Sequence, residues 1–191
     1  MTNPIKKLKS VSINKIASVA VFILLILLIS NYAYASSETN RVYKLVNNLR
    51  LEKGKELLVV NEKLEKAAYL RVQDMFSKQY FDHFVINGLS PWDAIKVSGY
   101  DYNFAGENLA IGFTNEDNAF NAWVKSPTHY QNMLDSDYQE IGIAVVNGTM
   151  KGESKTLIVQ LFASDGSKTK GAKSNNNQLN KVVGWIKSLF K

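Results

Sequence analysis

The most apolar stretch of the chain lies close to its N-terminus. Residues 16–29 read IASVAVFILLILLI and follow a segment that carries four lysines and no acidic residue. A helix of this length covers about 21 Å, which is short of the roughly 30 Å hydrocarbon core of a bilayer. Ala33 and Ala35 then form the small-x-small pattern of a signal-peptidase site. The pattern predicts a signal peptide over residues 1–35, cleaved after Ala35, with an uncleaved membrane anchor as the alternative.

Two amphipathic segments follow, and each predicts a helix. The first lies between about residues 37 and 53 and ends at Gly54, and its apolar stripe consists of Val42, Leu45, Val46 and Leu49. After a short apolar run at residues 57–60, Asn61 is a good N-cap for a second helix that reaches about residue 79. The apolar side of this second helix comprises Leu64, Ala67, Ala68, Val72, Met75 and Phe76.

Two further helices are predicted from their capping signals. The third begins at Ser90-Pro91-Trp92-Asp93, which supplies a cap, a first-turn proline and an N3 carboxylate, and it ends at Gly99. The fourth begins at Thr114, with Asp117 three residues on, and extends to about residue 125.

The hydrophobic period changes after His129. Residues 141–146 (IGIAVV) and 156–162 (TLIVQLF) are β-rich, and Asn147-Gly148 and Lys151-Gly152 are turn signals between them. Paired antiparallel strands are therefore expected. Because the helices come first and the strands afterwards, the fold class predicted is a layered α+β domain.

Composition and charge exclude several classes of protein. The 191 residues contain no cysteine, which excludes a thiol nucleophile, a cysteine-ligated metal and a disulfide framework. The formal charge of +6 belongs to the two ends, because residues 36–165 hold 13 basic and 17 acidic residues. A basic nucleic-acid-binding domain is therefore not expected.

The C-terminal part of the chain differs from the rest. Residues 166–178 are polar and rich in lysine, serine and asparagine, which predicts a linker. Residues 179–191 place apolar and lysine residues at helical spacing, which predicts a basic amphipathic helix. This helix either packs back on the domain or contacts an anionic membrane surface or wall polymer.

Three residues are candidates for chemistry. The chain has two histidines, so any histidine-dependent function uses His83 or His129, although a lone histidine is more often structural. Between them, Glu107 lies in the small and apolar segment 105–110. An unpaired buried carboxylate is costly, so Glu107 needs a partner or a wet cavity.

These residues and their surroundings resemble the CAP superfamily (cysteine-rich secretory proteins, antigen-five and plant pathogenesis-related proteins), in its cysteine-free bacterial SCP-like branch. The resemblance covers about residues 38–163 and consists of several motifs in the same order. The motifs are Asn47-Asn48-Leu49-Arg50, Ala67 through Asp74-Met75, Tyr80-Phe81-Asp82-His83, Gly106-Glu107-Asn108-Leu109-Ala110, Trp123-x-x-Ser126-Pro127-x-His129-x-x-Asn132-x-Leu134, Ile141-Gly142 and Val159-Gln160-x-Phe162.

The resemblance implies an α–β–α sandwich, with a central antiparallel sheet between helical layers. It also implies a cleft in which His83, Glu107 and His129 converge. The eukaryotic branch often carries a second glutamate three residues after a tryptophan, and here that position after Trp123 is Ser126. The four-residue set of the family is therefore incomplete in this chain.

Such a cleft has two chemical interpretations. Two imidazoles and one carboxylate suit zinc or another divalent cation, so His83, Glu107 and His129 are expected metal ligands. Alternatively, they form a hydrogen-bonded network that fixes loops around the cleft. A Ser126–His129–Glu107 triad is disfavoured, because Ser126-Pro127 is a turn or helix-end signal and no nucleophile elbow is present.

The function expected is non-catalytic binding by an exported protein in the extracellular or cell-wall space. The ligand would be a divalent metal or a lipid-like, glycan or cell-wall compound, with aromatic residues lining a groove. The aromatic candidates are Trp92, Tyr100, Tyr102, Phe104, Phe113, Trp123 and Tyr130. Two alternatives remain: a metal-dependent hydrolase that uses the same three residues, and a membrane- or wall-associated module that binds through its C-terminal helix.

Overall fold

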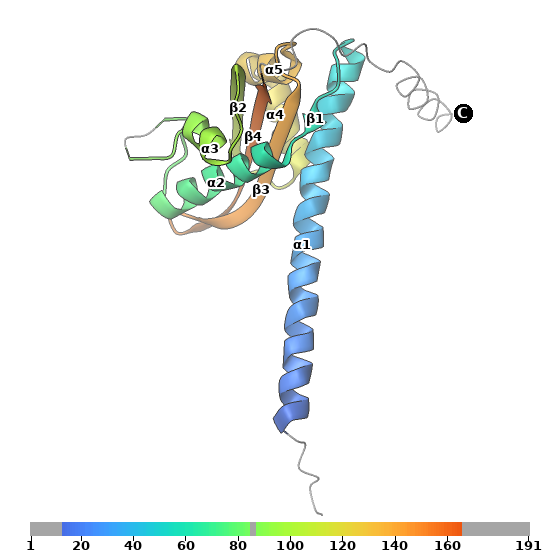
Figure 1. The fold of residues 1–191 in the computed structure, drawn as a ribbon, viewed down its shortest axis with the longest axis vertical. Helices are drawn as coiled ribbons and strands as arrows, with labels where there is room; N and C mark the ends of the chain where they lie inside the picture. The colour runs from blue at the N-terminus through green and yellow to red at the C-terminus, as the bar shows by residue number, and fades with distance from the viewer. Residues whose placement is uncertain (1–12, 85–86, 166–191) are drawn as a thin grey trace, which may run out of the picture.

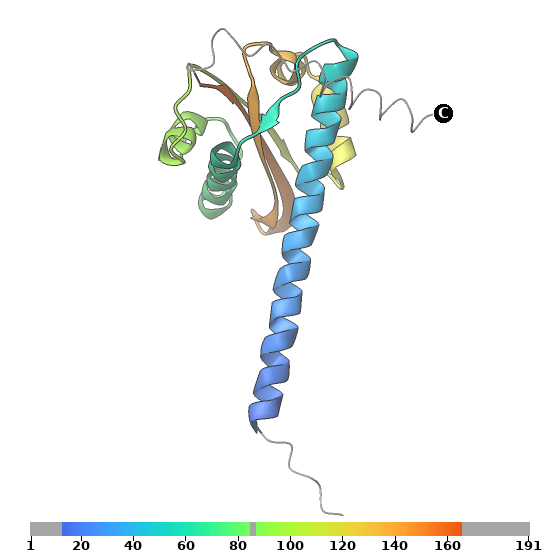
Figure 2. The same cartoon turned by 45° about the vertical axis from the view of Figure 1, so that its right-hand side comes forward.

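The structure is a computed structural model that describes residues 13–84 and 87–165, with the backbone alone for residues 13–17 and 25–37. It contains the expected α–β–α sandwich, in which helices cover both faces of a central sheet (Figures 1 and 2). The predicted linker over 166–178 and the helix over 179–191 lie outside the described residues.

The first helix is longer than the sequence pattern indicated. α1 (Ile13–Glu52) is continuous, whereas a helix was expected from about residue 37. Its sequence contains no glycine or proline, so nothing interrupts the hydrogen-bond ladder. Figure 1 shows its N-terminal half extending away from the sandwich. Among the described residues, no helix combines the length and the apolarity needed to cross a membrane. Cleavage after Ala35 stays a prediction.

The sheet has four strands over the described residues, in the order β1-β3-β4-β2. β1 (Val59–Val60) is parallel to β3 (Glu140–Met150), and β4 (Glu153–Ser164) is antiparallel to both β3 and β2 (Phe104–Ile111). β2, which carries Glu107, therefore lies at one edge of the sheet.

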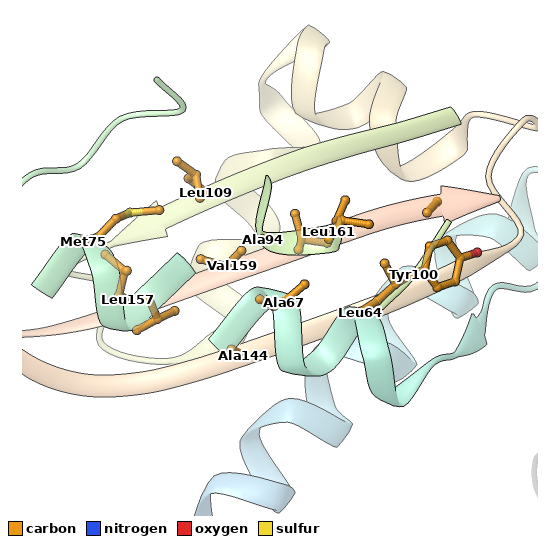
Figure 3. Packing of buried hydrophobic residues seen from close by; sticks show 14 of the residues in the cluster. Leu64, Ala67, Met75, Ala94, Tyr100, Leu109, Ala144, Leu157, Val159 and Leu161 are labelled. Atoms are coloured by element: carbon orange, nitrogen blue, oxygen red, sulfur yellow. The ribbon is translucent and has the colours of Figure 1, made fainter. Parts of the chain in front are cut away.

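A hydrophobic core fills the space on each face of the sheet. α2 (Glu62–Lys78) and α3 (Pro91–Val97) cover one face, and α1, α4 (Glu116–Lys125) and α5 (Pro127–Leu134) cover the other. Figure 3 shows the first core, with Ala67 of α2 over β4, the strand that carries Val159 and Leu161. α2 packs so closely on β3 that a Cβ at Gly142 would lie 2.0 Å from the carbonyl carbon of Leu64.

Several local signals are confirmed. The side chain of Asn61 accepts hydrogen bonds from the first turn of α2, and the side chain of Ser90 accepts one from Asp93 N at the start of α3. Gly54 and Gly99 follow α1 and α3 with φ angles of 67° and 82°, the left-handed conformation that ends helices without a steric penalty.

Other local predictions were wrong. The N-cap of α4 is Asn115, while Thr114 accepts a hydrogen bond from the Asn118 side chain. The β3–β4 turn lies at Lys151-Gly152 alone, and Asn147 pairs with Thr156 inside the hairpin. The order of elements also differs, because β2 lies between the helices. The segment 104–111 was not recognised as a strand, since its residues from Gly106 to Ala110 are buried and show no alternation.

Candidate functional site

The site is centred on a buried ion pair between β2 and α2. The side chain of Glu107 points to the α2 face of the sheet, where its Oε2 lies 2.8 Å from Nε of Arg71. A second guanidinium nitrogen donates to Glu107 Oε1 at 3.2 Å. The side chains of Arg71 and Glu107 are 0% and 2% exposed, so neither charge is solvated by bulk water. The partner that Glu107 required is therefore Arg71.

Arg71 also fixes the segment between α2 and α3. Its guanidinium donates to the carbonyl oxygens of Asp82, His83 and Leu89, and to the hydroxyl of Tyr80. A guanidinium carries five N–H donors in a rigid plane, which suits it to hold several acceptors at fixed positions. The loop that carries His83 is therefore positioned by the same side chain that neutralises Glu107.

A second carboxylate completes this loop anchor. Asp74 accepts hydrogen bonds from the Tyr80 hydroxyl and from the backbone N–H of Leu89, both at 2.6 Å, and forms an ion pair with Lys78. Hydrogen bonds that favour its ionised form hold the pKa of the Asp74 carboxyl below its usual range, although burial opposes them. Asp74 and Arg71 together fix Tyr80 between them.

His83 contacts Glu107 directly and remains accessible. Its Nδ1 lies 2.7 Å from Glu107 Oε1, and its side chain is 44% exposed. The hydrogen bond to the carboxylate raises the pKa of His83 above its ordinary 6.5, while burial and the Arg71 charge oppose the rise. Because an ionised carboxylate is an acceptor, Nδ1 carries the proton and Nε2 offers a lone pair in the neutral ring.

His129 lies on the opposite side of β2, in α5. Its Nδ1 is 2.7 Å from the hydroxyl of Ser126, the residue that joins α4 to α5. Burial lowers the pKa of His129 below 6.5, and the charge of His83 lowers it further.

Side-chain amides attach α5 to the edge strand. Asn132 Nδ2 donates to the backbone carbonyl of Glu107 and to Asn108 Oδ1, and Asn108 Nδ2 donates to the carbonyl of His129. Asn108 also donates to Gln160, whose buried Nε2 has no hydrogen-bond partner among the described residues. This network fixes His129 relative to Glu107 through the backbone.

The three predicted site residues therefore do not share one set of hydrogen bonds. Glu107 contacts the His83 imidazole, whereas the described hydrogen bond of the His129 imidazole goes to Ser126. Over residues 13–84 and 87–165, no group of three or more histidine, aspartate or glutamate side chains is arranged to hold a metal ion. The Ser126–His129 hydrogen bond exists, but Glu107 is bonded to His83 and Arg71, so these contacts do not form a Ser–His–Glu relay.

Arg71 is the functional residue that the sequence reasoning missed. A signal for it was present, because position 71 lies within the apolar stripe of α2, between Ala68 and Met75. An arginine on a buried helix face implies a buried acidic partner, and Glu107 was the carboxylate in the most apolar setting.

Two solved structures of similar fold come from bacterial proteins. An extracellular protein of Bacillus anthracis that contains an SCP domain superposes with a TM-score of 0.59 and 21% identity, covering 69% of this chain and 41% of that one. An outer surface protein of Borrelia burgdorferi superposes with a TM-score of 0.57 and 24% identity, covering 67% of this chain and 92% of that one.

Comparison of the sequence with a family model and with curated proteins gives the family. The chain is 36% identical over 127 residues to the uncharacterized protein YkwD of Bacillus subtilis (strain 168), covering 66% of this chain and 47% of that protein. It is 26% identical over 110 residues to the uncharacterized membrane protein YlbC of the same organism, covering 58% and 32%. The chain thus spans half or less of the length of these relatives. The model of the cysteine-rich secretory protein family (CAP) matches residues 43–162, so the chain belongs to this family.

Proposed function

We propose that this chain is an exported CAP-domain protein that binds a ligand through the imidazoles of His83 and His129 without transforming it. The observation that carries the proposal is the buried pair between Glu107 and Arg71. Export is supported by the N-terminal sequence and by the extracellular and surface origin of two proteins of similar fold.

Glu107 is poorly suited to act as a general base. Arg71 contacts both of its carboxylate oxygens, and His83 contacts one of them. A base must take up a proton in the reaction, and protonating Glu107 would leave the buried Arg71 charge without its counter-ion. The carboxylate therefore holds the site together and orients His83, which disfavours the alternative of a hydrolase that uses the same three residues.

The two imidazoles have the properties of ligand-binding groups. The described hydrogen bonds of both rings use Nδ1, so each Nε2 is the nitrogen that we assign to the ligand. A carboxylate bonded to the far nitrogen of a histidine fixes the ring orientation and increases its basicity toward a metal. His83 and His129 would hold the divalent cation, and Glu107 would orient His83 without being a ligand itself. Two protein ligands predict a weaker site than the three or four of established zinc sites.

Zinc binding tests this division of roles. Calorimetry on the full chain should show one zinc site that is lost in a His83→Ala/His129→Ala variant. A Glu107→Gln variant keeps a hydrogen-bond acceptor for His83 and should weaken zinc binding without abolishing it. Loss of binding in Glu107→Gln, with the circular dichroism spectrum unchanged, would instead make Glu107 a ligand.

A further inference from the structure

A cavity of about 700 Å³ lies at the N-terminal end of α2, apart from the histidine site. It is lined by residues 60–63, residues 99–103, Glu140 and Asp165, and so by none of His83, Glu107 and His129. Figure 3 shows Tyr100 beside Leu64, at the opposite end of α2 from Met75. Lys63 and Arg71 are eight residues apart on α2, which is about 12 Å along a helix.

The lining of this cavity is acidic. Four carboxylates line it, from Glu62, Asp101, Glu140 and Asp165. Lys63 contributes an ammonium, which donates to the carbonyl of Gly99 at 2.8 Å. Glu140 is 7% exposed, and its two oxygens accept hydrogen bonds from the Tyr100 hydroxyl and from Asn61 Nδ2, which hold its negative charge in the wall of the cavity. A negative lining with a buried carboxylate attracts a cation.

An anion is disfavoured although a helix begins here. The N-terminal amides of a helix often bind anions, but the side chain of Asn61 accepts from the N–H groups of Lys63 and Leu64. The backbone carbonyl of Asn61 accepts from Glu65 N. The N–H groups of Lys63, Leu64 and Glu65 are therefore satisfied within the chain, and the carboxylates repel a negative group.

A bare metal ion is also disfavoured. Calcium needs several oxygen ligands at 2.3–2.6 Å, and no group of three or more acidic or histidine side chains in the described ranges could hold a metal. The volume instead falls within the range of sites for small organic ligands. Carboxylates spaced around a cavity of this volume suit an organic cation that carries its positive charges at the ends of an apolar carbon chain.

Two tyrosines lie in the wall of the cavity: Tyr100, which is only 5% exposed, and Tyr102, which is half-buried and offers the more accessible ring. Tyr100 is held by its hydrogen bond to Glu140, and the ring of Tyr102 lies 6.2 Å from that of Trp92. Both rings are thus fixed by contacts with neighbouring side chains. Aromatic faces attract ammonium groups and cover methylene carbons, which matches the two parts of an alkyl amine.

We propose that this cavity is a binding site for primary alkyl amines, such as a diamine or a lysine side chain. The alkyl amine that occupies the cavity has two candidate sources. One is an amine outside the protein. The other is this chain itself, because Asp165 is followed by residues 166–191, which contain six lysines and no acidic residue.

The test uses cadaverine, a five-carbon diamine, and the diol of the same length. Calorimetry on the full chain should show diamine binding but no diol binding. The Glu62→Gln/Asp101→Asn variant should bind the diamine about tenfold more weakly, given what two ion pairs near a protein surface contribute. The control variant Glu52→Gln/Glu153→Gln removes the same charge from exposed residues outside the cavity and should leave binding unchanged.

A second protein background, in which the six C-terminal lysines are replaced by glutamine, distinguishes an external amine from a lysine of the chain. The replaced residues are Lys168, Lys170, Lys173, Lys181, Lys187 and Lys191. Equal binding in both backgrounds supports an external amine, whereas binding that emerges only in this background supports the chain's own lysines. The proposal is overturned if the diamine binds in neither background, if the diol binds equally well, or if Glu62→Gln/Asp101→Asn has no effect.

Discussion

Glu107 Oε2 and Arg71 Nε lie 2.8 Å apart in a pair whose side chains are almost completely buried. This contact joins the edge strand β2 to α2 and, through the other guanidinium contacts of Arg71, to the loop that carries His83. The ion pair is therefore the structural centre of the histidine site.

Removing one partner of this pair should destabilise the protein strongly. Arg71→Met leaves Glu107 buried without its counter-ion, which typically costs about 3–5 kcal/mol. Urea denaturation followed by circular dichroism measures the change in the free energy of unfolding. The double variant Arg71→Met/Glu107→Met should recover part of the loss, because no charge remains buried.

The exposed pair between Arg41 and Asp117 provides the control. Its side chains are about half exposed, so Arg41→Met should change the free energy of unfolding far less. Equal effects of Arg41→Met and Arg71→Met would contradict the structural role given to Arg71.

The pKa values of the two histidines should lie on opposite sides of 6.5. The hydrogen bond between His83 and Glu107 raises the pKa of His83, whereas burial lowers the pKa of His129. On acidification, NMR should therefore show that His83 protonates first. His83→Gln should raise the pKa of His129, because it removes the nearby positive charge. An unchanged His129 titration in that variant would indicate that the rings do not interact.

These two pKa shifts make the stability of the folded protein depend on pH in opposite ways. Protonated His83 stabilises the folded state, and this contribution is complete below 6.5 and is lost as pH rises through the raised pKa. Neutral His129 is favoured by folding, so its contribution is present above 6.5 and is lost as pH falls through the lowered pKa. His83→Gln should remove the first dependence and reduce the second, because the His83 charge contributes part of the lowering of the His129 pKa.

Gly142 should tolerate no side chain. A Cβ there would lie 2.0 Å from the Leu64 carbonyl carbon and 2.2 Å from Glu65 N, and these backbone atoms cannot rotate away. Gly142→Ala should therefore destabilise the fold by at least the ~1–3 kcal/mol of a typical overpacked core. Gly148→Ala is the matched comparison, because there the three nearest atoms belong to the Phe76 ring, at 2.8–3.0 Å, and a side chain can shift. Thermal unfolding should rank Gly142→Ala as the more damaging change.

The sequence predicts local features better than distant contacts. The caps at Asn61 and Ser90 follow from residues within one turn of each other, so short-range chemistry determines them. The turn was misplaced because Asn147-Gly148 and Lys151-Gly152 both suit tight turns, and the strand register decides between them. Recognising motifs of the family identified the sandwich, which periodicity alone described only as layered α+β.

The candidate site was predicted in part. His83 and Glu107 are in contact as expected, but the partner of Glu107 lies 36 residues earlier in the chain. Which carboxylate meets Arg71 depends on how β2 packs against α2, and the hydrophobic pattern contains no such information. The loop anchor around Asp74 and Tyr80 was missed for the same reason.

In the proposed function, His83 and His129 bind the ligand while Glu107 is structural. Zinc calorimetry on the full chain, beside the His83→Ala/His129→Ala variant, separates these roles. We expect one zinc per chain, with binding abolished in the double variant and retained, more weakly, in Glu107→Gln. Absence of zinc binding, or binding that survives loss of both imidazoles, would overturn the assignment of the two histidines as ligands.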